Sequence, residues 1–333
     1  MKTFKLKTTL AALLCLLLLL TGCGTQEKRE SGKLSIVTTV FPVYDWVREC
    51  TAGVDNAEIT LLLDNGVDLH SYQPGADDMV KVSTCDVFIC VGGESDEWVD
   101  DALAGAVNEN MIVINLLEVL GSGAKEEELV EGMQDEHGHE HDEDEDEAGH
   151  EEHGPEYDEH VWLSLKNAAF FCQYISEALC RADAANREAY SSAASAYIAK
   201  LNALDAEYAE AVSAAPTRTV LFGDRFPFRY LVDDYGLDYY AAFAGCSAET
   251  EASFDTIIFL AGKTDELGLR HILKTESSDG SIADTVRRTT ASGDQTVLTL
   301  DSLQSTTGKD AAGGKTYLGT MRENLAVLRE ALN

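Results

Sequence analysis

The sequence predicts an α/β protein of two lobes, each built on a parallel sheet, joined by one long helix. Short strand-like runs alternate with helical segments along the chain, which indicates parallel βαβ units with helices on both faces of each sheet. The chain has 333 residues, of which 45% are hydrophobic. This length exceeds the usual size of a single core and therefore favours two lobes.

The first half of the chain contains four predicted strands with helices between them. Each strand is a short apolar run, rich in β-branched residues and in most cases followed by a turn signal or by glycines. A proline near the start of the segment that begins at Phe41 indicates the first turn of a helix. Further helices are expected from residue 77 and over residues 98–106. The four strands are expected at residues 33–40, 57–63, 86–93 and 111–116.

The connecting helix is expected over residues 183–213. The segment is rich in alanine, and its larger apolar residues recur at spacings of seven, four, three, four and four, which places them on one stripe of a helix. About thirty residues at about 1.5 Å each give a length of roughly 45 Å, enough to run beside both lobes. We interpret the stripe as core packing. Its members are Tyr190, Tyr197, Leu201, Leu204, Tyr208 and Val212.

The second half repeats the alternation. Strands are expected at residues 219–223, 237–243, 271–275 and 295–300, with helices at 228–235, 253–267, 281–290 and 314–332. Binding groups in such folds gather in loops beyond the carboxyl ends of the strands. Asp224, Glu276 and Asp301 each follow a predicted strand directly. One carboxylate in this position is more often a helix N-cap than a ligand, but three at one edge of a sheet favour a binding site. His70 and His160 also lie in loops where such a site could form.

An acidic, histidine-rich stretch lies at residues 135–160, DEHGHEHDEDEDEAGHEEHGPEYDEH, and holds six of the eight histidines. Its glycines and charges leave no apolar periodicity, so residues 124–158 are expected to form a solvated loop. An acidic run is ordinarily a charged tether, but imidazole beside carboxylate suits zinc, copper, nickel or manganese. His160 stands where this loop re-enters the folded body. The other five are expected to collect metal ions weakly: His137, His139, His141, His150 and His153.

The N-terminus has the pattern of a secretory signal. Residues 1–22 carry lysines and then a short leucine-rich core, which is too short to span a membrane. Residues 20–23, LTGC, resemble a bacterial lipobox, which implies cleavage before Cys23 and lipid attachment to it. An uncleaved signal anchor is the alternative. Residues 23–33 then form a tether, and we expect an extracytoplasmic protein that is lipid-anchored to the bacterial cell membrane.

Charge and cysteine content limit the partners further. The formal net charge of -34 argues against nucleic acid or an anionic membrane surface as a partner and favours cations. Six cysteines remain beyond Cys23, which permits up to three disulfides in any of about fifteen full pairings. Because the chain contains no CxxC motif, cysteine is the weaker prediction for a metal ligand.

Three motifs resemble those of a known family. Residues 66–74, GVDLHSYQP, are similar to the pattern G-x-D-P-H-x-Y-x-P, although proline is missing at position 69. Residues 158–163, DEHVWL, are similar to D-x-H-x-W-L, and residues 228–237 are similar to A-F-x-Y-F followed by Y-G-L. From Leu34 onward the chain therefore resembles the solute-binding proteins of metal-ion ABC transporters, the zinc and manganese class called cluster A-I.

The resemblance implies an N-terminal lobe at residues 34–182, the helix at 183–213 and a C-terminal lobe at 214–333, with an ion in the cleft between the lobes. It implies His70 and His160 as the first two ligands and Asp301 as the fourth. The family's third ligand, His or Glu, falls on Arg225 here, and arginine cannot donate to a cation. Either Asp224 takes this place, while Arg225 pairs with a carboxylate, or Glu276 or water closes the site.

The implied function is capture of a divalent metal ion, zinc first and manganese second, for delivery to an ABC permease in the membrane. We expect a monomer and no enzymatic activity. A metallohydrolase is disfavoured because the chain has no HExxH or GxSxG motif and no Cys/His pair at catalytic spacing. A surface metal store or adhesin without transport remains the alternative.

Overall fold

The computed structural model describes residues 32–134, 156–247 and 251–333, and residues Leu34–Asn333 form one compact unit. Cys23 and the five histidines of the expected ion-collecting loop lie outside the described residues. None of the described helices has the length and apolar character needed to cross a membrane.

The N-terminal lobe contains a four-stranded parallel sheet with the strand order β2-β1-β3-β4. Every residue of β3 is buried, as expected for a strand covered on both faces. The strands are β1 (Leu34–Thr38), β2 (Ala57–Leu61), β3 (Val87–Cys90) and β4 (Ile112–Asn115). The helices between and after them are α2 (Phe41–Cys50), α3 (Ala76–Thr84), α4 (Trp98–Ala104) and α5 (Leu116–Leu120). The four predicted strands are confirmed.

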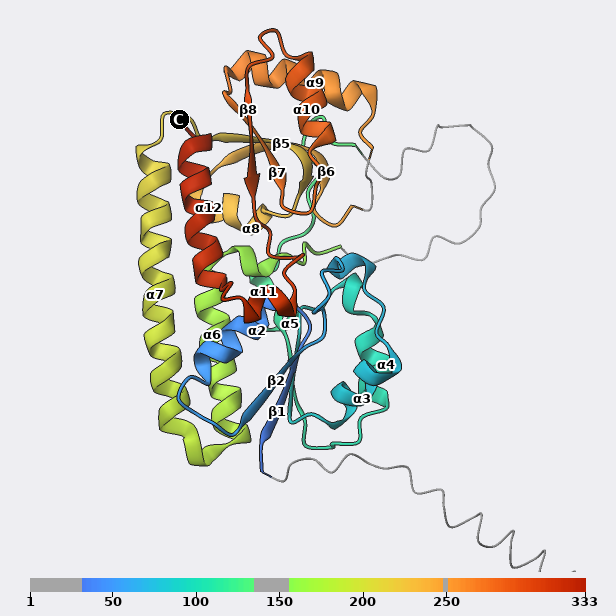
Figure 1. Cartoon of the computed structure of the whole chain (residues 1–333), viewed down its shortest axis with the longest axis vertical. Helices are drawn as coiled ribbons and strands as arrows, with labels where there is room; N and C mark the ends of the chain where they lie inside the picture. The colour runs from blue at the N-terminus through green and yellow to red at the C-terminus, as the bar shows by residue number, and fades with distance from the viewer. Residues whose placement is uncertain (1–31, 135–155, 248–250) are drawn as a thin grey trace, which may run out of the picture. The chain divides into compact units, whose positions relative to one another are not determined.

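Two long antiparallel helices follow, α6 (Leu165–Ala182) and α7 (Arg187–Ala214). Helix α7 packs against α6 and α2 at one end of its length and against α8 and α12 further along (Figure 1). All six members of the predicted apolar stripe are buried, which confirms the connecting helix as a core element. Helix α6 has no counterpart among the predicted elements.

The C-terminal lobe repeats the arrangement, with the strand order β6-β5-β7-β8 and parallel pairing throughout. Its strands are β5 (Thr219–Phe226), β6 (Asp238–Ala244), β7 (His271–Thr275) and β8 (Thr296–Leu300). Its helices are α8 (Arg229–Tyr235), α9 (Phe254–Leu267), α10 (Ser281–Thr289), α11 (Gly308–Ala312) and α12 (Tyr317–Ala331). Strand β5 continues three residues beyond its predicted end, after a register shift between Phe222 and Arg225. Asp224 therefore lies within a strand.

Buried polar contacts join the two lobes around Trp162, which is fully buried. Its indole Nε1 donates to the carbonyl of Ser302 at 2.9 Å, and its own carbonyl accepts from the Tyr317 hydroxyl at 2.6 Å. The backbone N–H of Tyr317 donates to the Asp45 carboxylate of α2 at 2.8 Å. These bonds link elements that are distant in sequence, and one continuous apolar core spans both lobes.

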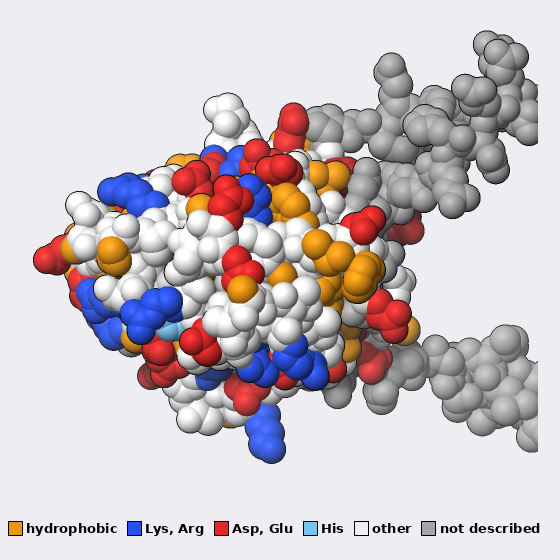
Figure 2. Space-filling view, turned by 90° about the horizontal axis from the view of Figure 1, so that it is seen from above, with side chains coloured by type: hydrophobic (Ala, Val, Ile, Leu, Met, Phe, Trp, Pro, Cys, Tyr) orange, Lys and Arg blue, Asp and Glu red, His pale blue; other side chains and the backbone are white. Residues whose placement is uncertain are grey.

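The six cysteines in the described part of the chain all carry reduced thiols: Cys50, Cys85, Cys90, Cys172, Cys180 and Cys246. None of the disulfides that their even number would permit is therefore formed among these residues. On the face shown in Figure 2, Lys and Arg side chains are interspersed with Asp and Glu. The large negative charge of the chain is thus not gathered into one acidic field on this face.

Candidate metal site

His70 lies in a single 3-10 turn, Leu69–Ser71, in the loop that follows β2. The Asp68 side chain caps this turn by accepting from the backbone N–H of His70 at 3.1 Å. The imidazole Nδ1 lies 2.8 Å from Ser95 Oγ and 3.6 Å from Glu159 Oε2. Partners on Nδ1 fix the orientation of an imidazole ring and leave Nε2 free to bind a metal ion.

His160 precedes the 3-10 turn Val161–Leu163 and has no exposed surface. The Asp158 carboxylate accepts from the backbone N–H of His160 at 2.8 Å, and the same oxygen lies 2.9 Å from its Nδ1. The ring also packs edge-on against Trp162, with centroids 5.3 Å apart. A carboxylate behind Nδ1 is the arrangement that orients metal-binding histidines in many proteins.

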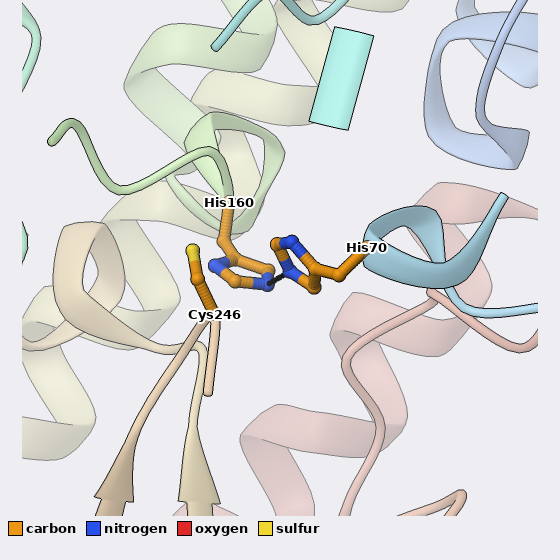
Figure 3. Close-up of side chains that lie close together, drawn as sticks. All are labelled: His70, His160 and Cys246. Atoms are coloured by element: carbon orange, nitrogen blue, oxygen red, sulfur yellow. Dashed lines mark hydrogen bonds between the residues drawn. The ribbon is translucent and has the colours of Figure 1, made fainter. Parts of the chain in front are cut away.

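The two imidazoles meet across 90 residues of sequence, with their Nε2 atoms 3.4 Å apart (Figure 3). This distance is long for a hydrogen bond between nitrogens. It matches the separation of about 3.3 to 3.4 Å between two nitrogens that each lie about 2.0 to 2.1 Å from a tetrahedral zinc ion. His70 and His160 are therefore spaced as a pair of metal ligands.

A third potential ligand, Cys246, lies in the turn two residues beyond the end of β6. Its sulfur, one imidazole nitrogen of His70 and one of His160 all lie within 4.8 Å of one another (Figure 3). In the part of the chain that the structure describes, this is the one group of three or more such side chains at this spacing. Sequence reasoning missed Cys246, although the rule that selected the strand-end carboxylates applies equally to a residue just after β6.

Burial and nearby charges shift the titration of these groups in different directions. Burial, with the neighbouring His160, lowers the pKa of His70 to about 4, so its ring is neutral at pH 7. Burial also acts to lower the pKa of His160, but the Asp158 carboxylate outweighs it and raises that pKa above the ordinary value. Burial raises the pKa of the Cys246 thiol well above its usual range. Burial likewise raises the pKa of Glu159 to about 7.

Asp301 follows β8 as predicted, but both of its carboxylate oxygens have partners. Oδ1 accepts from the backbone N–H of Leu303 at 2.8 Å, and Oδ2 pairs with Lys315 Nζ at 2.7 Å. Asp301 is not a member of the group formed by the two histidines and Cys246. Its role as the fourth ligand stays a prediction, and it requires the contact with Lys315 to open.

The other two predicted carboxylates also bind within the C-terminal lobe. Asp224 accepts from the backbone N–H and the hydroxyl of Thr275, both at 2.8 Å, and from its neighbour's N–H at 2.8 Å. Glu276 accepts from the backbone N–H of Ser302 at 2.7 Å and from the hydroxyl of Ser305 at 3.1 Å. These bonds tie the ends of β5, β7 and β8 together. Neither residue is part of the histidine and cysteine group.

Arg225 connects the strand end of the C-terminal lobe with the loop that carries His70. Its guanidinium pairs with Asp68 Oδ2 at 2.8 Å and donates to the carbonyl of Ser247 at 3.2 Å. The arginine at the family's third-ligand position thus pairs with a carboxylate, and that carboxylate is Asp68.

Comparison with known proteins identifies relatives of the whole folded unit. Residues 36–331 match the ZnuA family, described as zinc-uptake complex component A, periplasmic. The zinc-binding lipoprotein AdcA of Streptococcus pneumoniae serotype 4 is 32% identical over 322 residues, which cover 96% of this chain and 60% of AdcA. The high-affinity zinc uptake system protein ZnuA of Bacillus subtilis is 27% identical over 334 residues, which cover 99% of this chain and 98% of that protein.

A solved structure supports the same relationship. The Zn(II)-bound ZnuA-like domain of Streptococcus pneumoniae AdcA superposes with a TM-score of 0.67 at 27% identity and covers 90% of this chain and 99% of that domain. The chain spans 60% of the length of the AdcA relative it matches. Because the family match runs from the first strand to the last helix, this chain belongs to the ZnuA family, the periplasmic component A of zinc-uptake complexes.

Proposed function

We propose that this chain is an extracytoplasmic solute-binding protein that captures a divalent metal ion, zinc in preference to manganese, and delivers it to an ABC permease. The observation that carries the proposal is the 3.4 Å separation of the Nε2 atoms of His70 and His160. Both Nδ1 atoms have fixed partners, so both Nε2 atoms are directed to the same point. Membership of a zinc-uptake family supports the same function.

Capture would link ion binding to the arrangement of the lobes. The His70 loop already contacts the C-terminal lobe through the ion pair of Asp68 with Arg225. An ion bound between this loop and the rest of the site stabilises whichever arrangement of the lobes brings its ligands together. The permease would then distinguish the loaded protein from the empty one by that arrangement.

The remaining features complete the proposal. Cys23 carries the lipid that holds the protein at the outer face of the cell membrane, and the monomer works beside its permease. The histidine-rich loop raises the local concentration of ions near the site through many weak contacts. Its five histidines do not form the tight site, because ordering a long loop costs more free energy than weak chelation returns.

A titration with zinc and manganese tests where the tight site lies. The variants are His70→Ala, a deletion of residues 136–153, and the control His271→Ala, which removes a histidine on β7. We expect the His70 variant to lose tight zinc binding and the other two to retain it. Loss of tight binding in the deletion, with retention in the His70 variant, would assign the tight site to the loop and overturn the proposal.

A surface metal store or adhesin would give the same titration, so a transport measurement is also needed. A strain that lacks this chain is complemented with the wild-type or the His70→Ala gene, and uptake of radioactive zinc is measured under zinc limitation. We expect only the wild-type gene to restore uptake. Equal uptake with and without the wild-type gene would favour the store or adhesin.

A further inference from the structure

The turn that carries Cys246 is held against His160 by its backbone. The backbone N–H of Cys246 donates to Glu127 Oε1 at 2.9 Å. A Cβ atom on the preceding residue, Gly245, would lie 2.9 Å from the carbonyl of Phe226 and 3.1 Å from Cε1 of His160. A side chain at position 245 would therefore push the turn away from the imidazole, and glycine allows the turn that carries Cys246 to approach the Cε1–Nδ1 edge of His160 closely.

Arg225 forms polar contacts with two of the loops around His70, His160 and Cys246. Through Asp68, whose carboxylate also accepts from the backbone N–H of His70, it supports the turn that carries His70. Through the carbonyl of Ser247 it supports the residue next to Cys246. A guanidinium cannot bind a cation itself. At this position it instead connects the loop of one ligand to the loop of another candidate ligand, which makes it a positioning residue.

We propose that Cys246 is the third protein ligand of the captured ion and replaces the ligand that Arg225 cannot provide. This inference rests on the proposed function, because it concerns the same site. Around a tetrahedral zinc ion, a nitrogen and a sulfur lie about 3.6 Å apart, from bond lengths of about 2.0 to 2.1 Å and about 2.3 Å. The sulfur and one nitrogen of each imidazole already lie within 4.8 Å of one another, so adjustment of the side chains within the site would bring all three ligands to one ion.

Binding by Cys246 has a consequence for the choice of metal. The thiol proton leaves to solvent and the sulfur–metal bond forms, so the ligand set becomes two neutral imidazoles and one thiolate. Thiolate is a soft donor that selects zinc and copper(I), whereas manganese prefers oxygen ligands. As the third ligand, in place of the His or Glu that the family resemblance implies at position 225, the cysteine thus favours zinc over manganese. The fourth position is left to water or to a carboxylate.

Cobalt(II) substitution tests the thiolate directly, since a sulfur–cobalt bond gives an intense charge-transfer absorption in the near ultraviolet that nitrogen and oxygen ligands do not give. The full chain is titrated with one equivalent of cobalt as wild type, Cys246→Ala, Cys246→Ser and Cys180→Ala. Cys180 is a buried thiol that bonds Ser191 and thus serves as the matched control. The cysteines at positions 15 and 23 are present in every variant, so difference spectra isolate position 246.

We expect the charge-transfer band in the wild type and in Cys180→Ala, and its loss in both Cys246 variants. We expect the zinc affinity of the Cys246 variants to fall by at least about 10- to 100-fold. Removal of a hydrogen-bond partner of a metal ligand has an effect of this size, and removal of the ligand itself should cost at least as much. Thermal unfolding without metal checks that the variants are folded.

A band that persists in Cys246→Ala, or is absent from a wild-type protein that binds cobalt, would overturn the inference while the proposed function stands. Failure of the wild type to bind zinc or cobalt tightly would overturn both. His70→Ala tests the proposed function independently of the thiolate. If the proposed function holds, this variant loses the metal binding of the wild type whether or not Cys246 is a ligand.

Discussion

Replacing Asp158 with asparagine removes the negative charge behind His160 and leaves the shape of the side chain. An amide oxygen can still accept from the backbone N–H of His160, as the carboxylate does at 2.8 Å. What changes is the contact at 2.9 Å with Nδ1, where a charged acceptor becomes a neutral one. The substitution therefore makes His160 a less basic ligand without removing it.

The expected loss of zinc affinity is about 10- to 100-fold, the range found when an outer partner of a metal-binding histidine is removed. It corresponds to about 1.4 to 2.7 kcal/mol of binding free energy. The sign of the pH dependence follows from the raised pKa of His160. Zinc binds the neutral ring, so the affinity of the wild type falls as pH decreases through this pKa. Without the Asp158 charge the pKa of His160 is lower, and the fall begins at a lower pH.

The assay is competition for zinc with a chromophoric chelator between about pH 8 and about pH 6. We expect Asp158→Asn to bind zinc more weakly than the wild type at about pH 8, and the difference in affinity to narrow toward about pH 6. Asp205→Asn is the control, since Asp205 accepts a hydrogen bond from Tyr235 at 2.9 Å on α7. Equal zinc affinity of Asp158→Asn and wild type at high pH, or a difference in affinity that widens in acid, would show that the Asp158 charge does not support His160 as a ligand.

Three further substitutions test the scaffold and the site. Gly93→Ala and Gly53→Ala both place alanine at φ +85°, a strained conformation for a residue with a Cβ atom. Only at Gly93 does the new Cβ approach a buried carboxylate oxygen, at 2.4 Å, and there ψ is -169°, in a region that is essentially restricted to glycine. In urea unfolding, the free energy of unfolding of Gly93→Ala should be lower than that of Gly53→Ala by about 1 to 3 kcal/mol. Equal losses of stability in the two variants would contradict the contact. Tyr208→Phe should lower the free energy of unfolding by about 1 kcal/mol, because the Tyr208 hydroxyl donates to a carbonyl of α12 at 2.6 Å. Tyr197→Phe should leave the stability unchanged, because its buried hydroxyl has no hydrogen-bond partner. Similar melting temperatures for the two variants would argue against this difference. Cys246→Asp should lower zinc affinity more than manganese affinity, and calorimetry that shows an unchanged ratio would count against a thiolate ligand.

Most of the fold was predictable because it depends on local patterns. Apolar runs with turn signals identified all eight strands, and helical spacing identified α7. Helix α6 could also have been predicted, since Phe171, Ile175 and Leu179 recur at four-residue spacing on its buried face. The extension of β5 could not be predicted from the sequence. It depends on a register shift against β6, which is a tertiary pairing and leaves no local signal.

The site was predictable only in part. A resemblance of motifs, and not the spacing of residues, indicated that His70 and His160 converge. The strand-end rule correctly located Glu276 and Asp301 at the ends of their strands. It could not show that backbone N–H groups, hydroxyls and Lys315 engage their oxygens, because those partners lie up to 29 residues away in sequence. Cysteine was the weaker prediction for a ligand because the chain has no CxxC motif, and the histidine partners of Cys246 lie in loops that are distant in sequence.

Whether His70 and His160 bind the same ion is shown most directly by the position of zinc in crystals of the full chain grown with one equivalent of the metal. Anomalous diffraction at the zinc edge locates the ion independently of any assumed ligand. We expect one dominant peak about 2.0 to 2.1 Å from Nε2 of both His70 and His160. A dominant peak elsewhere, with the two rings unbound, would contradict it.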